Sequence, residues 1–115
     1  MKNFLLILLI ICTTTLMGQN LVPNPSFEEY HCIPPHSDKM DCVKYWFVPN
    51  SETTDYFHVN APVDDNSPVH SSVNIPSGWF GYQPTRTGDA YIGIHIWQLF
   101  HLNRREYASV ELIEP

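Results

Sequence analysis

Prolines and small polar residues occur so often in this 115-residue chain that no uninterrupted stretch is long enough for a long helix. Ten prolines stand at or beyond position 23, and Asn, Ser, Asp and Thr fill much of the sequence between them. A proline inside a helix removes a hydrogen bond and clashes with the preceding turn. What remains are short runs rich in β-branched and aromatic residues, separated by turn clusters, a pattern typical of an all-β sandwich or barrel.

Six strands are predicted from these runs. They are Leu21–Glu28, Val43–Val48, Asp55–Val59, Gly78–Gln83, Ala90–Trp97 and Tyr107–Ile113. The prolines of the first run mark an edge strand or an irregular one, and residues 60–72 are expected to form a long surface loop. A two-sheet jelly roll has about eight strands. We therefore expect a sandwich that is incomplete at its C-terminus, either as a fragment or with an exposed last strand.

The first 19 residues have the layout of a secretory signal peptide. Lys2 precedes an apolar run from Phe4 to Cys12, and a small and polar stretch follows as far as Gly18. The run is about half the length of the ~20 residues that a spanning helix needs. The sequence thus predicts a cleaved signal over 1–19 and a domain over 20–115, exported and not membrane-spanning after cleavage. A lipid anchor at Cys12 and an uncleaved anchor are the alternatives.

The charge of the chain excludes some partners. Once Lys2 leaves with the signal, five Lys and Arg residues face twelve Asp and Glu residues, a net charge of −7. An acidic chain without a basic run offers no electrostatic surface to nucleic acid or to anionic lipid. The sequence therefore predicts no nucleic-acid partner.

Two cysteines remain after the signal, and they predict a disulfide. Cys32 and Cys42 enclose a short loop that contains two prolines, and an even number of cysteines in an exported protein favours a disulfide. Closing this loop would contribute about 2–3 kcal/mol to stability. The alternative is a metal site with His31 and His36, although the spacing does not match that of zinc modules.

The run "AYIGIHIW" predicts two different faces because side chains alternate along a strand. The aliphatic face carries Ala90, Ile92, Ile94 and Ile96, and the other face carries Tyr91, Gly93, His95 and Trp97. We expect the aliphatic face in the core. The second face is either a platform for a flat ligand such as a sugar ring, or a second buried face beneath loops.

Several segments together resemble a known group of proteins. "NLVPNPSFEEY", "HCIPP", "VKYWFVPNSETTDYFHVNAP", "VNIPSGWFGYQPTRTGDAYIGI" and "REYASVELIEP" occur in this order. The chain resembles the N-terminal domain of secreted and outer-membrane proteins of Gram-negative bacteria, which often end in a peptidoglycan-binding or sorting domain. The opening "NLVPNPSFE" also resembles the first strand of carbohydrate-binding modules with a galactose-binding-like jelly roll. The resemblance implies that fold, further strands beyond Pro115, and a place outside the cell or on the outer-membrane surface, with the periplasm as an alternative.

The carbohydrate-binding relatives often carry a structural calcium ion beside the first strand. The resemblance places the corresponding acid at Glu28, and Asp89 is a second candidate because it lies beside a turn. Calcium prefers six to eight oxygen ligands. The alternative for Glu28 is an ordinary solvated strand residue.

Catalysis is not predicted. The chain has no Gly-x-Ser-x-Gly elbow, no His-Glu-x-x-His motif and no phosphate-binding glycine loop. His58 and Asp55 could form a base with an orienting acid, but no nucleophile stands at a recognisable spacing.

Two function classes therefore compete. One is a non-catalytic module that binds surface or extracellular polysaccharide. Its candidate ligand-binding residues are Trp79, Tyr82, Tyr91, His95 and Trp97. The other is a structural or protein-interaction domain, with outer-membrane proteins as partners, in which the same aromatics belong to the core.

Overall fold

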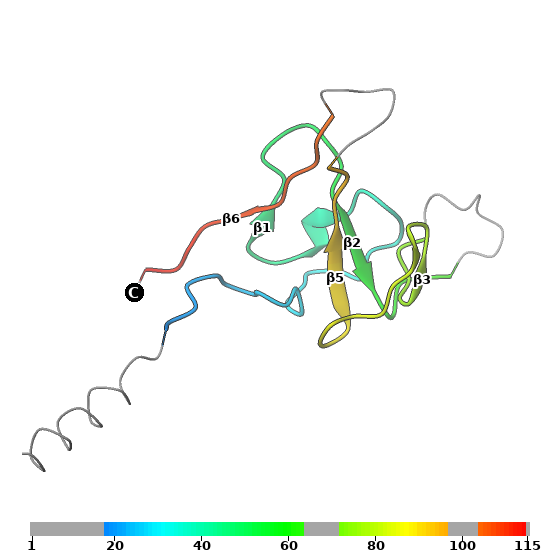
Figure 1. Ribbon diagram of the computed structural model, residues 1–115, viewed down its shortest axis with the longest axis horizontal. Coiled ribbons are helices and arrows are strands. Elements are labelled where there is room, and N and C mark those ends of the chain that lie inside the picture. The colour runs from blue at the N-terminus through cyan, green and yellow to red at the C-terminus, as the bar shows by residue number, and fades with distance from the viewer. Residues whose placement is uncertain (1–17, 64–71, 97–103, 115) are drawn as a thin grey trace, which may run out of the picture.

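The computed structural model describes residues 18–63, 72–96 and 104–114, and Figure 1 shows how they are arranged. Their strands pair in antiparallel twos: β1 (Trp46–Phe47) with β6 (Ser109–Val110), β2 (Asp55–His58) with β5 (Ala90–Gly93), and β3 (Ser77–Gly78) with β4 (Gly81–Tyr82). One 3-10 turn, η1 (Met40–Cys42), is the only helical element in these ranges. The all-β prediction is confirmed. The described strands form three separate pairs rather than the two stacked sheets of a jelly roll.

The ribbon of β2 and β5 is the centre of the fold (Figure 1). Its register sets Phe57 opposite Tyr91 and Tyr56 opposite Ile92. Both strands are rich in aromatic and β-branched residues, which pack well on a pleated surface. Asp55–Val59 was predicted as a strand, and the observed β2 differs from it by one residue.

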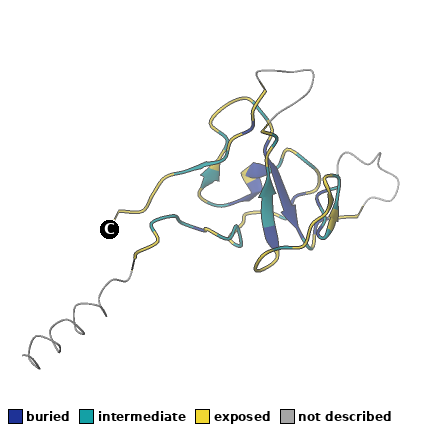
Figure 2. Cartoon of the chain, in the orientation of Figure 1, coloured by how far each residue is buried: buried dark blue, intermediate teal, exposed yellow. Residues whose placement is uncertain are grey.

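All four residues of β2 are buried, because β2 has neighbours on both edges and both faces (Figure 2). On the edge away from β5, the N–H of His58 donates to the carbonyl of Val73, and His58 and Asn74 form a parallel bridge. Each face has its own core. One core gathers Met40, Cys42, Val43, Tyr56 and Ala90, and the other gathers Phe57, Ala61, Val73 and Ile75.

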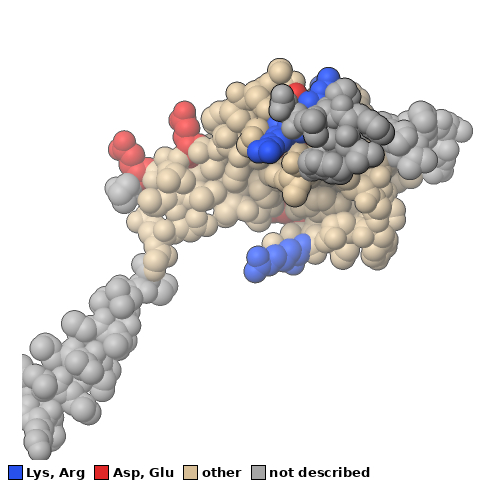
Figure 3. All heavy atoms as spheres, turned by 45° about the horizontal axis from the view of Figure 1, so that its top comes forward, with Lys and Arg blue, Asp and Glu red and all other residues tan. Residues whose placement is uncertain are grey.

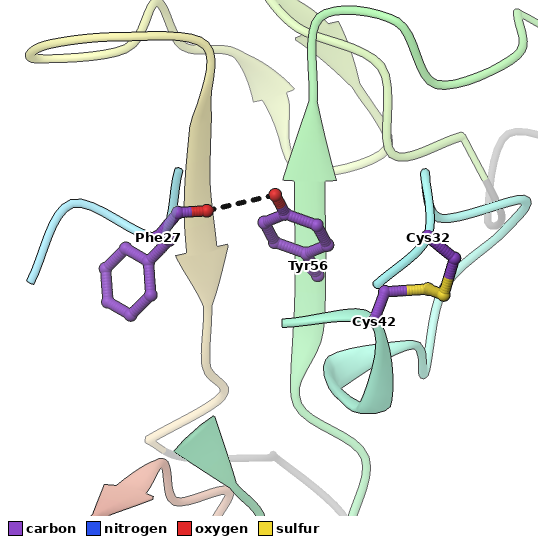
Figure 4. The surroundings of a disulfide bond; sticks show 4 residues. All are labelled: Phe27, Cys32, Cys42 and Tyr56. Carbon is purple, nitrogen blue, oxygen red and sulfur yellow. Dashed lines mark hydrogen bonds between the residues drawn. A yellow bond between two sulfur atoms is a disulfide. The ribbon is translucent and has the colours of Figure 1, made fainter. Parts of the chain in front are cut away.

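The disulfide prediction is confirmed. Cys32 and Cys42 are joined, and Figure 4 shows the bond close to β2. Cys42 is buried in the same core as Tyr56, so the bond ties the exposed loop to the centre of the fold. On the other side of Tyr56, its hydroxyl donates to the carbonyl of Phe27 at 3.0 Å (Figure 4).

The predicted first strand, Leu21–Glu28, is wrong. The segment is a turn in which Asn24 and Phe27 have positive φ angles, 47° and 63°. Asn24 is buried and bonds with its side-chain amide: Nδ2 donates to the carbonyls of Glu29 and Lys44, and Oδ1 accepts the N–H of Glu29. Asparagine favours such local bonds over a strand ladder, and the flanking prolines lack the N–H that a ladder needs.

The other predicted strands are shorter than expected. Tyr45 has a φ of 72°, which interrupts Val43–Val48 and leaves only β1. Gly78–Gln83 is not one strand but contains the end of β3, the turn and β4, since Gly81 has a φ of 108° and lets the chain reverse. From Tyr107–Ile113, only Ser109–Val110 pairs as a strand.

The long strand predicted over Ala90–Trp97 ends at Gly93. Ala90 and Ile92 pack in the core as expected. Ile94 and Ile96 do not, with 44% and 74% of their surfaces exposed, and they lie beyond the last pair of the ribbon, Asp55 with Gly93. Trp97 lies outside the described residues, as does the signal region over 1–17. Within the described ranges, no helix has the length and apolar character to cross a membrane.

Candidate functional site

Aromatic side chains from three segments meet on one side of the β2–β5 ribbon. We call the group Trp79, Phe80, Tyr82, Tyr91 and His95 the aromatic surface. The His95 ring lies 5.2 Å from the Trp79 ring and 4.8 Å from the Phe80 ring, between centroids. Tyr91 stacks on Phe57 of β2 at 4.8 Å and 16°. Four of the five predicted ligand-binding residues are therefore neighbours in the fold.

A shallow hollow of about 250 Å³ opens within the aromatic surface. We call it the Tyr82 hollow. Its lining is Phe80, Tyr82, Gln83, Tyr91, Gly93 and Ile94, and none of these residues carries a charge. Tyr82 is 75% exposed and Phe80 is 45% exposed, while Tyr91 is held in place by Phe57. The hollow thus combines one fixed ring, that of Tyr91, with two accessible rings, those of Tyr82 and Phe80.

Gly93 makes the close approach of these rings possible. A Cβ at this position would stand 2.9 Å from Cε2 of Phe57 and 3.1 Å from Cε2 of Phe80. Real Cβ atoms rarely approach ring carbons so closely. The glycine at this position of "AYIGIHIW" is therefore what allows Phe80 to fold over the ribbon toward Phe57, at 5.6 Å between ring centroids.

A buried carboxylate positions the Trp79 ring. Asp55 is 1% exposed, and its Oδ2 accepts the indole Nε1–H of Trp79 at 3.1 Å. Its Oδ1 accepts the N–H of Asp38 at 2.7 Å. Burial raises the pKa of the Asp55 carboxyl, and the charges of Asp38 and Glu106 raise it further, while these two hydrogen bonds lower it. Because Asp38 lies between the two cysteines, the disulfide loop is linked to the aromatic surface.

A second buried carboxylate holds His95. Glu106 is 6% exposed. Its Oε1 lies 3.0 Å from Nδ1 of His95, its Oε2 accepts the N–H of His95 at 2.7 Å, and its own N–H donates to the carbonyl of His95 at 3.0 Å. These contacts fix the backbone and the ring of His95 together. The rings of Trp79 and His95 are in contact with each other, and each ring is hydrogen-bonded to a buried carboxylate.

The two candidate calcium ligands are close, but the carboxylate of Glu28 already has partners. It accepts the N–H of Asp89 at 3.0 and 3.1 Å and the N–H of Ala90 at 3.2 Å. Glu28 therefore ties the turn before β5 to the N-terminal segment, which differs from the solvated role weighed above. In the part of the chain that the structure describes, no three His, Cys, Asp or Glu side chains form a metal-binding group. A calcium ion at Glu28 stays a prediction.

His58 and Asp55 do not form the pair considered above. Successive side chains of β2 point to opposite faces, and Asp55 bonds with Asp38 and Trp79. His58 instead lies against the rings of Tyr30 and Tyr56, and its Nδ1 accepts the N–H of Asn60 at 3.0 Å. Burial lowers the pKa of His58, although the charges of Asp89 and Glu28 act in the opposite direction.

Sequence reasoning missed Phe80, Asp55 and Glu106 as parts of this surface. Phe80 lies between Trp79 and Tyr82, so a hairpin assignment for "SGWFGY" would have included it. The two acids gave no signal in the sequence, because their roles depend on contacts with residues 24 and 11 positions away.

A larger hollow of about 520 Å³ lies elsewhere, between η1 and β1. Its lining includes Trp46 and Phe47, together with three acids and one base: Asp38, Asp41, Glu52 and Lys39. Its acidic character differs from that of the Tyr82 hollow.

Charge is sparse over much of the described surface. Figure 3 shows one face, on which uncharged residues cover most of the area and the Lys and Arg side chains form small separate groups. No protein-family model, no curated protein and no solved structure matches this chain.

Proposed function

We propose that this chain is a secreted or cell-surface module without catalytic activity that binds glycan on its aromatic surface. The observation that carries the proposal is the Tyr82 hollow, where Tyr82 and Phe80 are accessible and Tyr91 is fixed from below by Phe57. Sugar rings have apolar faces that stack on aromatic rings, and polar groups at the margin bind their hydroxyls.

The hollow has the composition that such recognition needs. The Tyr82 and Tyr91 hydroxyls and the Gln83 amide can exchange hydrogen bonds with a sugar, and the lining is otherwise apolar. Its volume of about 250 Å³ is small, which suits the face of one sugar ring rather than an enclosed ligand. Since Tyr91 stacks on Phe57, the ring of Tyr91 requires little ordering when a sugar binds.

Export supports an extracellular ligand. The leader pattern over residues 1–19 favours secretion, and a disulfide persists in oxidising compartments. A surface or extracellular polysaccharide is therefore the partner that we propose.

The second candidate is a structural or protein-interaction domain of the outer surface. Tyr45 and Phe47 favour it, because they are 57% and 46% exposed and lie away from the Tyr82 hollow, with Phe47 in the lining of the larger acidic hollow. Exposed aromatic residues of this kind are enriched at protein interfaces.

A glycan array probed with the exported chain distinguishes the two candidates. We expect binding to at least one polysaccharide or oligosaccharide class. On titration with that sugar, the NMR signals of the Phe80, Tyr82 and Tyr91 rings should shift, and those of Tyr45 and Phe47 should not. An array without binding, or shifts confined to Tyr45 and Phe47, would favour the protein-interaction candidate.

A further inference from the structure

A second hollow adjoins the Tyr82 hollow and differs from it in chemistry. It measures about 360 Å³, and its lining is Pro25, Ser26, Phe27, Arg86, Thr87, Ala90 and Tyr91. We call it the Arg86 hollow. Tyr91 belongs to the lining of both hollows, whereas Phe27 and Ala90 of the Arg86 hollow pack with the core on the other face of the ribbon. A ligand that occupies both hollows would therefore have to cross β5 at Tyr91.

Arg86 gives this hollow a positive charge. Arg86 is exposed, and it forms no ion pair with any residue that the structure describes. No Asp or Glu belongs to the described lining. A guanidinium presents several N–H donors in a plane and binds a carboxylate through two parallel hydrogen bonds.

The rest of the Arg86 hollow suits a sugar. Ser26 and Thr87 supply hydroxyls, and Phe27 and Tyr91 supply apolar ring surface. This is the same mixture of stacking and polar groups as in the Tyr82 hollow, with a cation added. A sugar ring that carries a carboxylate would match the hydroxyls, the aromatic ring surface and the cation of this hollow.

Glu28, the acid whose carboxylate packs on the turn after Arg86, does not line the Arg86 hollow. Glu28 directs its carboxylate at the N–H groups of Asp89 and Ala90, and these donors offset part of its charge. Without the predicted signal, the chain has five Lys and Arg residues against twelve Asp and Glu residues, a net charge of −7, which would repel a densely charged polyanion. A single acidic sugar beside a neutral one avoids most of this repulsion.

We propose that the Arg86 hollow is a subsite for the carboxylate of a uronic acid unit, whose neutral neighbour in the same glycan lies in the Tyr82 hollow. The inference rests on the proposed function and adds the ligand class: an acidic oligosaccharide with an uncharged unit next to the uronate.

Matched pairs of disaccharides test this subsite. Each pair consists of a neutral disaccharide and the same molecule with one uronic acid, such as cellobiose and cellobiouronic acid, with a sulfate ester of the neutral sugar as a third probe. Binding is measured by calorimetry at physiological salt, for the native chain and for Arg86→Gln. The matched control is Arg105→Gln, which removes the same charge at an exposed arginine outside both hollows.

We expect the uronic member of at least one pair to bind about fivefold more tightly than the neutral member. Arg86→Gln should abolish the preference and keep binding of the neutral sugar, whereas Arg105→Gln should keep both. Equal affinities within every pair, or a preference that survives Arg86→Gln, would overturn the subsite and leave the proposed function in place. Arg86-dependent preference for the sulfate ester alone would overturn the carboxylate assignment. Absence of binding to every probe, neutral ones included, would overturn both proposals.

Discussion

At the residue scale, two side chains of the aromatic surface are held in position by buried carboxylates. Asp55 fixes the indole of Trp79, and Glu106 fixes His95. Two buried carboxylates are costly to desolvate, and Asp55 shows this in its raised pKa. If these two positions served stability alone, apolar residues there would make the fold more stable. Their presence directly behind Trp79 and His95 fits a surface whose rings must keep one orientation.

His58 should make the stability of the fold depend on pH. Its Nδ1 accepts the N–H of Asn60, so the neutral ring is the form that the fold favours, and burial lowers its pKa below the ordinary value of 6.5. In the unfolded chain His58 takes up a proton near 6.5, whereas the folded chain takes it up only at lower pH. The free energy of unfolding should therefore fall as the pH drops below 6.5, until the pH reaches the lowered pKa.

Urea unfolding at a series of pH values between about 7 and about 5 measures this dependence. The comparison is with His58→Gln, for which the slope of unfolding free energy against pH should be smaller over the same window. His36→Gln is the control, because His36 is exposed. An unchanged slope in His58→Gln would show that another group is responsible.

At the element scale, the turn before β5 sets where the central ribbon begins. Gly88 has a φ of 65°, and a Cβ there would overlap the carboxylate of Glu28. This carboxylate binds the N–H groups of Asp89 and Ala90, and Ala90 is the first residue of β5. Glycine at 88 is thus required both by the backbone angle and by the side chain packed against it.

Gly88→Ala should lower the free energy of unfolding by about 2 kcal/mol, since it adds backbone strain and displaces Glu28. In a Glu28→Ala background the overlap is gone, so the same substitution should cost about 1 kcal/mol. Denaturant titration of the four proteins of the cycle measures the difference. Gly81→Ala serves as the control, because Gly81 has a positive φ and open space around it. Additive costs would mean that Glu28 does not pack on the turn as the structure places it.

The elements also show which parts of the fold can be read from the sequence. Asp55–Val59 was predicted within one residue of β2 because its aromatic and β-branched content favours a strand locally. Leu21–Glu28 was predicted wrongly although Asn24 and its flanking prolines are local signals for a turn, and Asn24 also bonds with Lys44, 20 residues away. Local pattern carries no information on a contact of that range. The same holds for Ala90–Trp97, whose pairing with β2 ends at Gly93.

At the scale of the whole molecule, the described residues form three antiparallel strand pairs, and the β2–β5 ribbon has a core on each face. The sandwich stays a prediction. The candidate site follows from the arrangement of these pairs. Trp79 and Tyr82 were chosen from the sequence for their type alone, and only the folding of the β3–β4 hairpin beside β5 brings them to Tyr91 and His95. The role of Trp97 stays a prediction, because that residue lies outside the described ranges.

The central claim is that exposed rings of the aromatic surface bind glycan, and the affinity of a single-ring variant tests it most directly. Tyr82→Ala removes an accessible ring from the hollow, and Tyr45→Ala removes an exposed ring outside it. Calorimetry with a sugar that the native chain binds should give an affinity about fivefold weaker for Tyr82→Ala, since stacking contributes about 1 kcal/mol. Tyr45→Ala should bind as the native chain does. Equal affinities for Tyr82→Ala and the native chain, or an equal loss in both variants, would contradict the claim.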